Sequence, residues 1–351
     1  MAENNVNRAN EREQARKELK AVFGAAEHEA VPMFEDAPCY PEADLVELYW
    51  IGYGIEHADS REERIRLVEK YDQKRRSIKK LPDAPERIYI WPDGAIPCLT
   101  DDYTDNSDHM YNHDPDFRPY FFEMLVDDDV TPKGLVIFCA GGDHGYAMFH
   151  EAYQSCKDFN RMGYQAILVA NRTNRCPWNA VDAAADVSRT IRLVRMNASK
   201  YRIPEDRVAV CGFSNGGVTA ENVIRYFSGE KKMTDYYPGY AADEADRFYG
   251  SPDAYLCLYG PRHAGSEFDY EGVEYPPTFF AVGREDRAWH NLNALYPQLV
   301  ERGIPVEIHT FAGVPHGKAG VEILDGKVKY PNFQMWLPLA DWFLMDLWRS
   351  E

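Results

Sequence analysis

The sequence predicts an α/β protein with a mostly parallel central sheet of about eight strands, flanked by helices and preceded by a helical extension. Two observations support this prediction. Apolar runs such as LVIF, AILV and VAV lack the alternation of half-buried strands, which is typical of parallel strands covered on both faces. From residue 86 onward these runs alternate with longer helical stretches, as expected where strand and helix follow each other in turn.

The N-terminal residues 1–85 have a different texture. NEREQARKELKAVFGAA, PEADLVELYWIGYGIEHA and SREERIRLVEKYDQKRRSIKK combine dense charge with helical spacing of apolar residues. Ser60, followed three residues later by Glu63, is a capping-box start for the third stretch. These helices carry too much apolar surface for solvent and too little for a core of their own. We therefore expect them to pack on residues 86–351 as a lid, or to form a homodimer contact.

Eight segments of residues 86–351 have the composition of strands. In chain order they are RIYIW, YFFEMLV, GLVIFC, QAILVA, RVAVCG, AYLCLYG, TFFAVG and PVEIHTF. Helical spacing predicts helices near residues 147–162, 178–200, 215–229, 288–302 and 333–349. The Asp-rich stretch 101–116 lies between the first two strands and is predicted to be a loop.

Composition excludes several classes of partner. The 351 residues include 39 Lys and Arg against 57 Asp and Glu, and the formal charge of −18 repels phosphate backbones and anionic membranes. We expect a neutral small-molecule or oligosaccharide substrate, with no nucleic-acid or membrane partner. The charged start of the chain does not resemble a secretory signal. The seven cysteines form no C-x-x-C pair, which predicts reduced thiols and a cytoplasmic protein.

The strongest local signal is RVAVCGFSNGG, in which a strand runs into G-x-S-x-G and then into a helical stretch. This is the context of a nucleophile elbow, in which a serine sits on a sharp turn above the sheet. Gly212 and Gly216 lack a Cβ, so strand and helix can approach each other there. The turn places the hydroxyl of Ser214 at a helix N-terminus, which favours developing negative charge.

A serine nucleophile needs a base and an orienting acid, and the loops after two later strands offer both. TFFAVG is followed by Asp286, and PVEIHTF is followed by His316 in VPHG. The carboxyl ends of parallel strands meet at one edge of a sheet, so the loops that hold Ser214, Asp286 and His316 can converge. Other acids stay open as alternatives: Glu285, then Glu267 and Asp269.

The loop after GLVIFC, with the sequence AGGDHGY, is predicted to supply half of an oxyanion hole. Its glycines let backbone amides approach a substrate oxygen, so the amide of Gly142 or Asp143 would act together with that of Asn215. We expect substrate contacts from His144, Tyr146 and Trp289. The spacing of His109 and His113 suits a metal, but these residues lie in the Asp-rich loop without a site pattern, so we predict no metal and no cofactor.

Together these segments resemble the acetyl-esterase, acetylxylan-esterase and feruloyl-esterase-like branch of the bacterial α/β-hydrolases, over roughly residues 86–351. The stretch DAAADVSRTIRLVRMNASKYRIPEDRVAVCGFSNGG is the most specific match, supported by PPTFFAVGREDRAW and VEIHTFAGVPHG. The resemblance implies an α/β-hydrolase fold with Ser214, Asp286 and His316 as the triad. Ala140 and Asp143 depart from the family's oxyanion loop, and Asn171 from its usual tyrosine.

The sequence therefore predicts a serine esterase, that is, a carboxylic-ester hydrolase. It would remove an acyl group, acetyl or aromatic, from a neutral carbohydrate-like or aromatic substrate through an acyl-enzyme. One alternative is a peptidase of the prolyl-oligopeptidase type, which would normally add a β-propeller that 85 helical residues cannot form. Another is a non-catalytic binding protein on a hydrolase fold, against which the complete set of triad residues argues.

Overall fold

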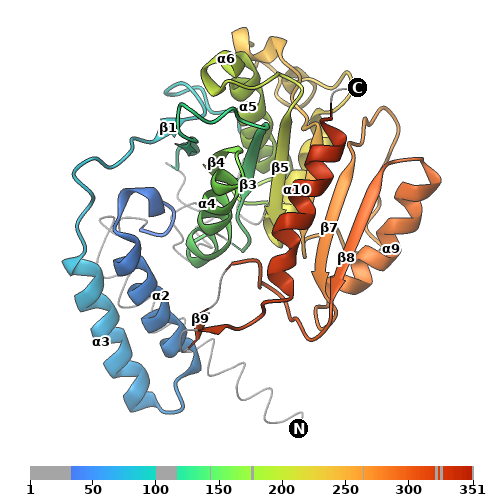
Figure 1. Cartoon of the computed structure of the whole chain (residues 1–351). Coiled ribbons are helices and arrows are strands. Elements are labelled where there is room, and N and C mark those ends of the chain that lie inside the picture. Colours follow the sequence, from blue (N-terminus) through green and yellow to red (C-terminus); the bar gives the residue numbers. More distant parts are fainter. Residues whose placement is uncertain are drawn as a thin grey trace.

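Eight strands form the central sheet in the computed structural model, which describes residues 33–99, 117–142, 144–174, 178–263, 265–320, 323–324 and 327–349. They are β1 (Ile88–Tyr89), β2 (Tyr120–Met124), β3 (Leu135–Cys139), β4 (Gln165–Ala170), β5 (Val208–Phe213), β6 (Ala254–Leu258), β7 (Thr278–Gly283) and β8 (Val306–Phe311). Their order is β1-β2-β4-β3-β5-β6-β7-β8 (Figure 1). β1 and β2 pair antiparallel, and β3 to β8 run parallel. The predicted α/β class and all eight predicted strands are confirmed.

Helices cover the sheet at the predicted places. The longer ones are α4 (Gln154–Arg161), α5 (Ala180–Met196), α7 (Asn215–Phe227), α9 (Ala288–Glu301) and α10 (Trp336–Leu347). α10 lies in front of the sheet in Figure 1. Shorter elements are the π-helix η3 (Met148–Tyr153), α6 (Ala198–Tyr201), α8 (Met233–Tyr236), the 3₁₀ turns η4 (Glu244–Arg247) and η5 (Phe333–Met335), and the hairpin β9 (Ile323–Leu324) with β10 (Lys327–Val328). The predicted helix at 147–162 therefore begins as a π-helix.

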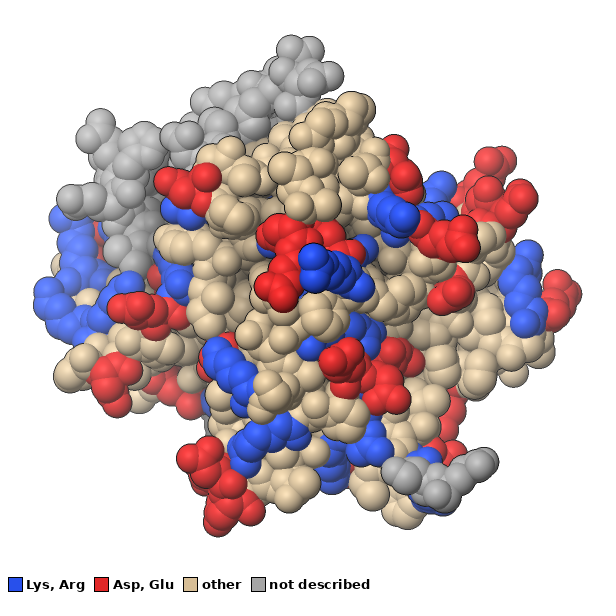
Figure 2. Space-filling view, turned by 90° about the horizontal axis from the view of Figure 1, so that it is seen from above, with Lys and Arg blue, Asp and Glu red and all other residues tan. Residues whose placement is uncertain are grey.

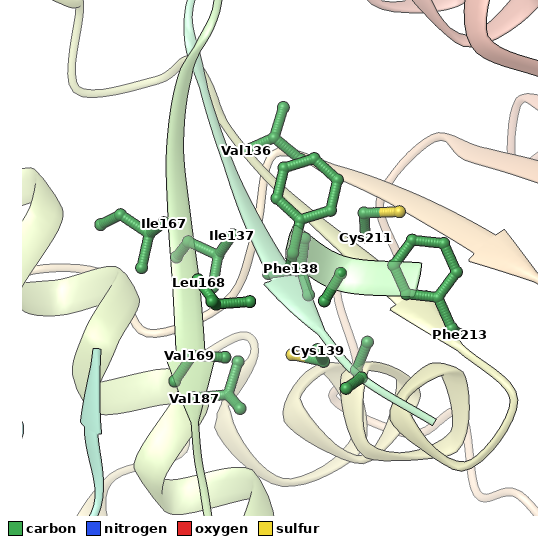
Figure 3. Packing of buried hydrophobic residues seen from close by; sticks show 14 of the residues in the cluster. Val136, Ile137, Phe138, Cys139, Ile167, Leu168, Val169, Val187, Cys211 and Phe213 are labelled. Carbon is green, nitrogen blue, oxygen red and sulfur yellow. The ribbon is translucent and has the colours of Figure 1, made fainter. Parts of the chain in front are cut away.

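The core explains why the strand sequences do not alternate. All five residues of β3 are fully buried, because helices cover both of its faces. Phe138 of β3 stacks with Phe213 of β5, their ring centroids 6.4 Å apart. Figure 3 shows both rings within the central cluster. Phe138 also contacts Phe159 of α4 at 5.2 Å, and Phe213 contacts Trp336 of α10 at 6.2 Å. Burial of such aromatic rings supplies much of the stabilisation of a core of this kind.

A buried ion pair holds the loop after β4. The guanidinium of Arg172 is 1% exposed and bonds both carboxylate oxygens of Asp186 in α5, at 2.7 and 3.0 Å. Burial, the largest single influence, lowers the pKa of Arg172, but Asp186, Asp182 and Tyr237 together outweigh it, so the pKa is raised. The indole of Trp91 donates to Asp186 at 2.7 Å, and Arg172 donates to the carbonyl of Pro97 at 2.8 Å. The network therefore ties the loop after β4 to the chain that leaves β1.

The described part of the N-terminal extension contains a 3₁₀ turn and two helices. They are η1 (Ala37–Cys39), α2 (Glu42–His57) and α3 (Arg61–Ser77). Ser60 caps α3, since its hydroxyl accepts from the amide of Glu63 at 3.1 Å, as the sequence predicts. The Glu63 carboxylate accepts from Asp59, one residue before the cap, and so does not complete the reciprocal capping box. The helical stretch predicted at 10–26 lies outside the described residues.

The described extension packs on residues 86–351 of the same chain. The fully buried carboxylate of Asp36 accepts from the Arg87 guanidinium at 2.6 Å and from the hydroxyl of Tyr120 in β2 at 2.8 Å. Phe34 packs on Tyr146 of the loop after β3, with ring centroids 4.8 Å apart. Both contacts come from the segment that precedes α2. Whether the extension acts as a lid or an oligomer contact stays a prediction.

The direction of the strands defines the edge where loops can build a site. α6 leads into β5 from the top of Figure 1, so the parallel strands end at the lower edge, on the side of β9 and α2. Figure 2 shows the opposite edge, where the described acidic and basic side chains are interspersed. Among the described residues, no helix is both long and apolar enough to cross a membrane.

Candidate active site

Ser214 stands on the sharp turn between β5 and α7. Its backbone has φ 49° and ψ −115°, a conformation that non-glycine residues rarely adopt and that clusters at functional sites. A Cβ at Gly212 would lie 2.4 Å from the carbonyl oxygen of Gly216, and one at Gly216 would lie 2.2 Å from that of Cys139. Neither position has room for a side chain, which confirms the reason given above for a glycine at both.

Ser214, His316 and Asp286 form one line of hydrogen bonds. The Ser214 hydroxyl lies 2.8 Å from Nε2 of His316, and Nδ1 of His316 lies 2.7 Å from Oδ2 of Asp286. Because a carboxylate only accepts, Nδ1 carries a proton and Nε2 is left to accept from the serine. The Asp286 side chain is fully buried and also accepts from the amide of Ala288, whereas 42% of the His316 side chain is exposed.

The alternative acids take no part in this line. Glu285 is exposed, and its backbone amide donates to the carbonyl of Val314, which joins the loops after β7 and β8. Glu267 and Asp269 are exposed. Within the described chain, no hydrogen bond joins any of these three carboxylates to His316. The geometry therefore favours Asp286 as the partner of the histidine.

The loop after β3 lies directly against the serine. A Cβ at Gly141 would stand 3.1 Å from Cβ of Ser214. Gly142 has φ 58°, and its carbonyl accepts from the side-chain amide of Asn215 at 2.9 Å. Asn215 opens α7, where first-turn amides have no intrahelical partner and the helix dipole favours negative charge. The amides of Gly142 and Asn215 thus belong to one corner of the site; Asp143 lies outside the described residues.

The three residues predicted to contact substrate have different surroundings. His144 is buried, with φ 69°. The hydroxyl of Tyr146 reaches α2, where a Cβ at Gly52 would lie 2.2 Å from it. These contacts indicate that Tyr146 packs the loop against the extension. Trp289 is half-buried, three residues beyond Asp286, and the Arg284 guanidinium lies 4.4 Å from its ring centroid.

Sequence reasoning missed three residues next to this site. The buried carboxylate of Glu151 in η3 accepts from the amide of Gly141 at 3.2 Å and from the hydroxyl of Tyr259 at 2.9 Å. Tyr259 also presents its ring edge-on to His316, with centroids 5.0 Å apart. Glu35, from the extension, accepts from the amide of Gly145 at 2.9 Å. A glutamate in a helical stretch looks like a surface residue, so the local sequence gives no signal for such contacts.

Replacing Glu35 with glutamine should change how stability depends on pH. Burial, the largest influence, raises the pKa of Glu35 from 4.5 to about 7. Between these values the folded state holds a proton on Glu35 that the unfolded state releases, so the contribution of Glu35 to stability falls as pH rises. At about 1.4 kcal/mol per pH unit the loss reaches about 3 kcal/mol, and glutamine cannot undergo it. Denaturant unfolding of both proteins from pH 4.5 to 7.5 measures this; a stability difference that does not vary with pH would contradict it.

Within the described residues, no cluster of three or more His, Cys, Asp or Glu side chains could hold a metal ion. The Asp-rich loop with His109 and His113 lies outside the described residues.

The fold and the elbow together define a class. A mostly parallel eight-stranded sheet, with helices on both faces and a strained serine between β5 and α7, is the α/β-hydrolase fold. The fold that the sequence resemblance implies is confirmed. Solved structures with similar folds include an acetyl ester-xyloside bifunctional hydrolase from Caldicellulosiruptor lactoaceticus, with a TM-score of 0.56 and 23% identity. The similarity covers 75% of this chain and 96% of that one.

Two further similarities are to an esterase of known structure and, in sequence, to a xylanase. A thermophilic esterase from the Planctomycetes species Thermogutta terrifontis, solved with propionate bound, has a TM-score of 0.52 and 18% identity, over 66% of this chain and 91% of that one. Endo-1,4-beta-xylanase B of Butyrivibrio fibrisolvens is 26% identical over 264 residues, which cover 68% of this chain. This chain spans 41% of the length of that xylanase. No family model matches the chain.

Proposed function

We propose that this protein is a serine esterase, in which Ser214 is the nucleophile, His316 the base and Asp286 the orienting acid. The observation that carries the proposal is the continuous hydrogen-bonded line from the buried Asp286 carboxylate through the imidazole to the serine, at 2.7 and 2.8 Å. A serine on a strained turn, bonded to an imidazole that a buried carboxylate orients, is the arrangement of acyl-transfer enzymes.

The reaction proceeds in two acyl transfers. His316 takes the proton of Ser214 as the serine oxygen attacks the ester carbonyl. The backbone amides of Gly142 and Asn215 then donate to the resulting oxyanion, and the amide of Asp143 is the alternative to that of Gly142. The protonated imidazole then gives its proton to the departing alcohol, leaving an acyl-serine. Water, deprotonated by the same imidazole, cleaves the acyl-serine, releases the acid and restores the serine.

The proposed substrate is an acetyl or other short acyl ester of a carbohydrate. Support comes from the names of similar proteins, which mention an acetyl ester-xyloside hydrolase, a xylanase and an esterase with propionate bound. The formal charge of −18 also suits a neutral substrate better than an anionic one. Trp289, half-buried next to the acid loop, offers a ring on which a sugar or an aromatic acyl group can stack.

A fluorophosphonate probe and a substrate panel test this function. The probe should label the protein once, with the label on the peptide that contains Ser214. The panel contains p-nitrophenyl esters of increasing acyl length, acetylated xylo-oligosaccharides, a feruloyl ester and a prolyl anilide. We expect acetate release from the oligosaccharide and the fastest p-nitrophenol release from the shortest acyl chain. Faster cleavage of the prolyl anilide would favour a peptidase, and absence of labelling would favour a binding protein.

A further inference from the structure

Next to the serine and histidine, the buried carboxylate of Glu151 lies between the loop after β3 and the loop that carries His316. Glu151 is 6% exposed and lies in the π-helix η3, a form of helix that is often found at functional sites. We propose that Glu151 is a positioning residue, which holds the oxyanion loop and the histidine loop in register for the esterase reaction. This inference rests on the proposed function, and neither the triad nor the oxyanion hole includes this residue.

The first contact of Glu151 is with the oxyanion loop. Its Oε2 accepts from the amide of Gly141 at 3.2 Å, and the carbonyl of Gly141 accepts from the amide of His144 at 3.2 Å. Both polar groups of the Gly141 backbone are therefore engaged, at the residue that stands against Ser214. A shift of the carboxylate would move this glycine, and with it the next amide in the chain, that of Gly142.

The second contact is with the histidine loop, through Tyr259. Oε1 of Glu151 accepts from the Tyr259 hydroxyl at 2.9 Å, and that hydroxyl accepts from the amide of Ala319 at 3.4 Å. The Tyr259 ring meets His316 edge-on at 5.0 Å. A Cβ at Gly317, next to the histidine, would lie 3.8 Å from Oε1. The same carboxylate thus lies next to two backbone segments: that of Gly141, which lies against Ser214, and that of Gly317, which follows His316.

The chemistry of the position also argues against simple packing. Burial raises the pKa of Glu151, because removing a carboxylate from water is costly. The groups that face it are the Tyr259 hydroxyl, the Gly141 amide, His316 and Lys318, and all four lower its pKa. An apolar side chain could fill this space without that cost. A polar group that is buried at such a cost and bonded to both loops fits a role in holding them.

The test compares Glu151→Gln, Tyr259→Phe and the double variant with wild type. Glutamine keeps the shape of the side chain but replaces one carboxylate oxygen with an N–H donor, and phenylalanine removes the Tyr259 hydroxyl that donates to the carboxylate. We expect kcat to fall about 10- to 100-fold, less than the 10²–10³ that loss of an oxyanion donor costs. KM should stay within about twofold, because the ground-state complex does not depend on this alignment. The double variant should be no worse than the poorer single variant, as for residues that act together.

Glu221→Gln is the matched control. Glu221 in α7 is also a buried glutamate, 2% exposed, and accepts from a tyrosine hydroxyl, that of Tyr275, at 2.8 Å. It pairs with Arg262, not with the loops of the triad. This variant should lose stability but keep kcat per active site, as titrated with the fluorophosphonate. Equal kcat losses in the Glu151 and Glu221 variants would show that the loss comes from general destabilisation of the fold, and would overturn the inference.

A second measurement needs no substrate and separates this inference from the proposed function. The proton between His316 and Asp286 should give a far-downfield resonance in the NMR spectrum of wild type. In Glu151→Gln and Tyr259→Phe we expect it to shift or broaden as the imidazole becomes less fixed, and in Glu221→Gln to stay. An unchanged resonance in the first two variants overturns the inference, whether or not wild type hydrolyses esters. A shifted resonance with kcat lowered supports it.

Discussion

Ser214→Ala should lower kcat for ester hydrolysis by about 10⁴-fold or more, with the fold intact. The alanine removes the oxygen that attacks the carbonyl, and no other described hydroxyl bonds to His316. The oxyanion amides and the binding surface remain, so a small residual rate over water is expected. The measurement is steady-state kinetics on the best ester of the panel, with thermal unfolding of both proteins. Because alanine also carries a Cβ, the strained backbone at this position should persist, and thermal stability should change little.

Two variants complete this experiment. His316→Ala should lose activity to a similar extent, because the serine then has no base. Ser266→Ala is the control, since this serine is exposed and, among the described residues, its hydroxyl donates only to the carbonyl of His263, so it should be replaceable without effect. If Ser214→Ala kept near-normal activity, the proposed nucleophile and with it the serine-esterase mechanism would have to be abandoned.

Asp286→Asn should lower kcat by roughly 10³–10⁴-fold near neutral pH. The asparagine amide can donate to Nδ1 of His316, which places the imidazole proton on Nε2, where it can no longer accept from the serine. Because asparagine keeps an oxygen for the amide of Ala288, the start of α9 should remain intact. Kinetics together with unfolding measurements would separate a change of tautomer, which lowers kcat alone, from damage to the loop.

Glu285→Gln is the matched control for this variant. Glu285 is the neighbouring carboxylate, and its side chain is exposed. Among the described residues, it bonds to the loop after β8 through its backbone amide and not through its side chain. Its side chain should therefore be replaceable with less than about a twofold change in kcat. A larger loss in Glu285→Gln than in Asp286→Asn would show that the orienting acid had been assigned to the wrong residue.

Much of the fold and the core of the site could be predicted from sequence because both follow from local rules. Strands buried on both faces have a recognisable composition, and loops after parallel strands converge on one edge. Gly212 and Gly216 flank Ser214 because backbone atoms lie within 2.4 Å of where their side chains would be. Such constraints are written within a few residues, so a short motif carries them.

The supporting contacts could not be predicted in this way, because they join residues far apart in the chain. Glu151 reaches Tyr259 across 108 positions, and neither residue stands in a motif. The π-helix that carries Glu151 has the same apolar spacing as the start of an ordinary helix, so the sequence predicts only a helix there. Glu35 belongs to a segment whose composition predicts packing without naming the surface on which it packs.

The contact between Glu35 and the amide of Gly145 also sets an order for the chain during synthesis. The two residues are 110 positions apart, so the ribosome makes the extension well before the loop that receives it. At 5–20 residues per second, this interval lasts roughly 5–20 s. For that time Tyr49 of α2 lacks its native partners Tyr146 and Phe149, and this face of the helix is exposed to chaperones and proteases. The extension therefore cannot complete its native packing until β3 and its loop have emerged.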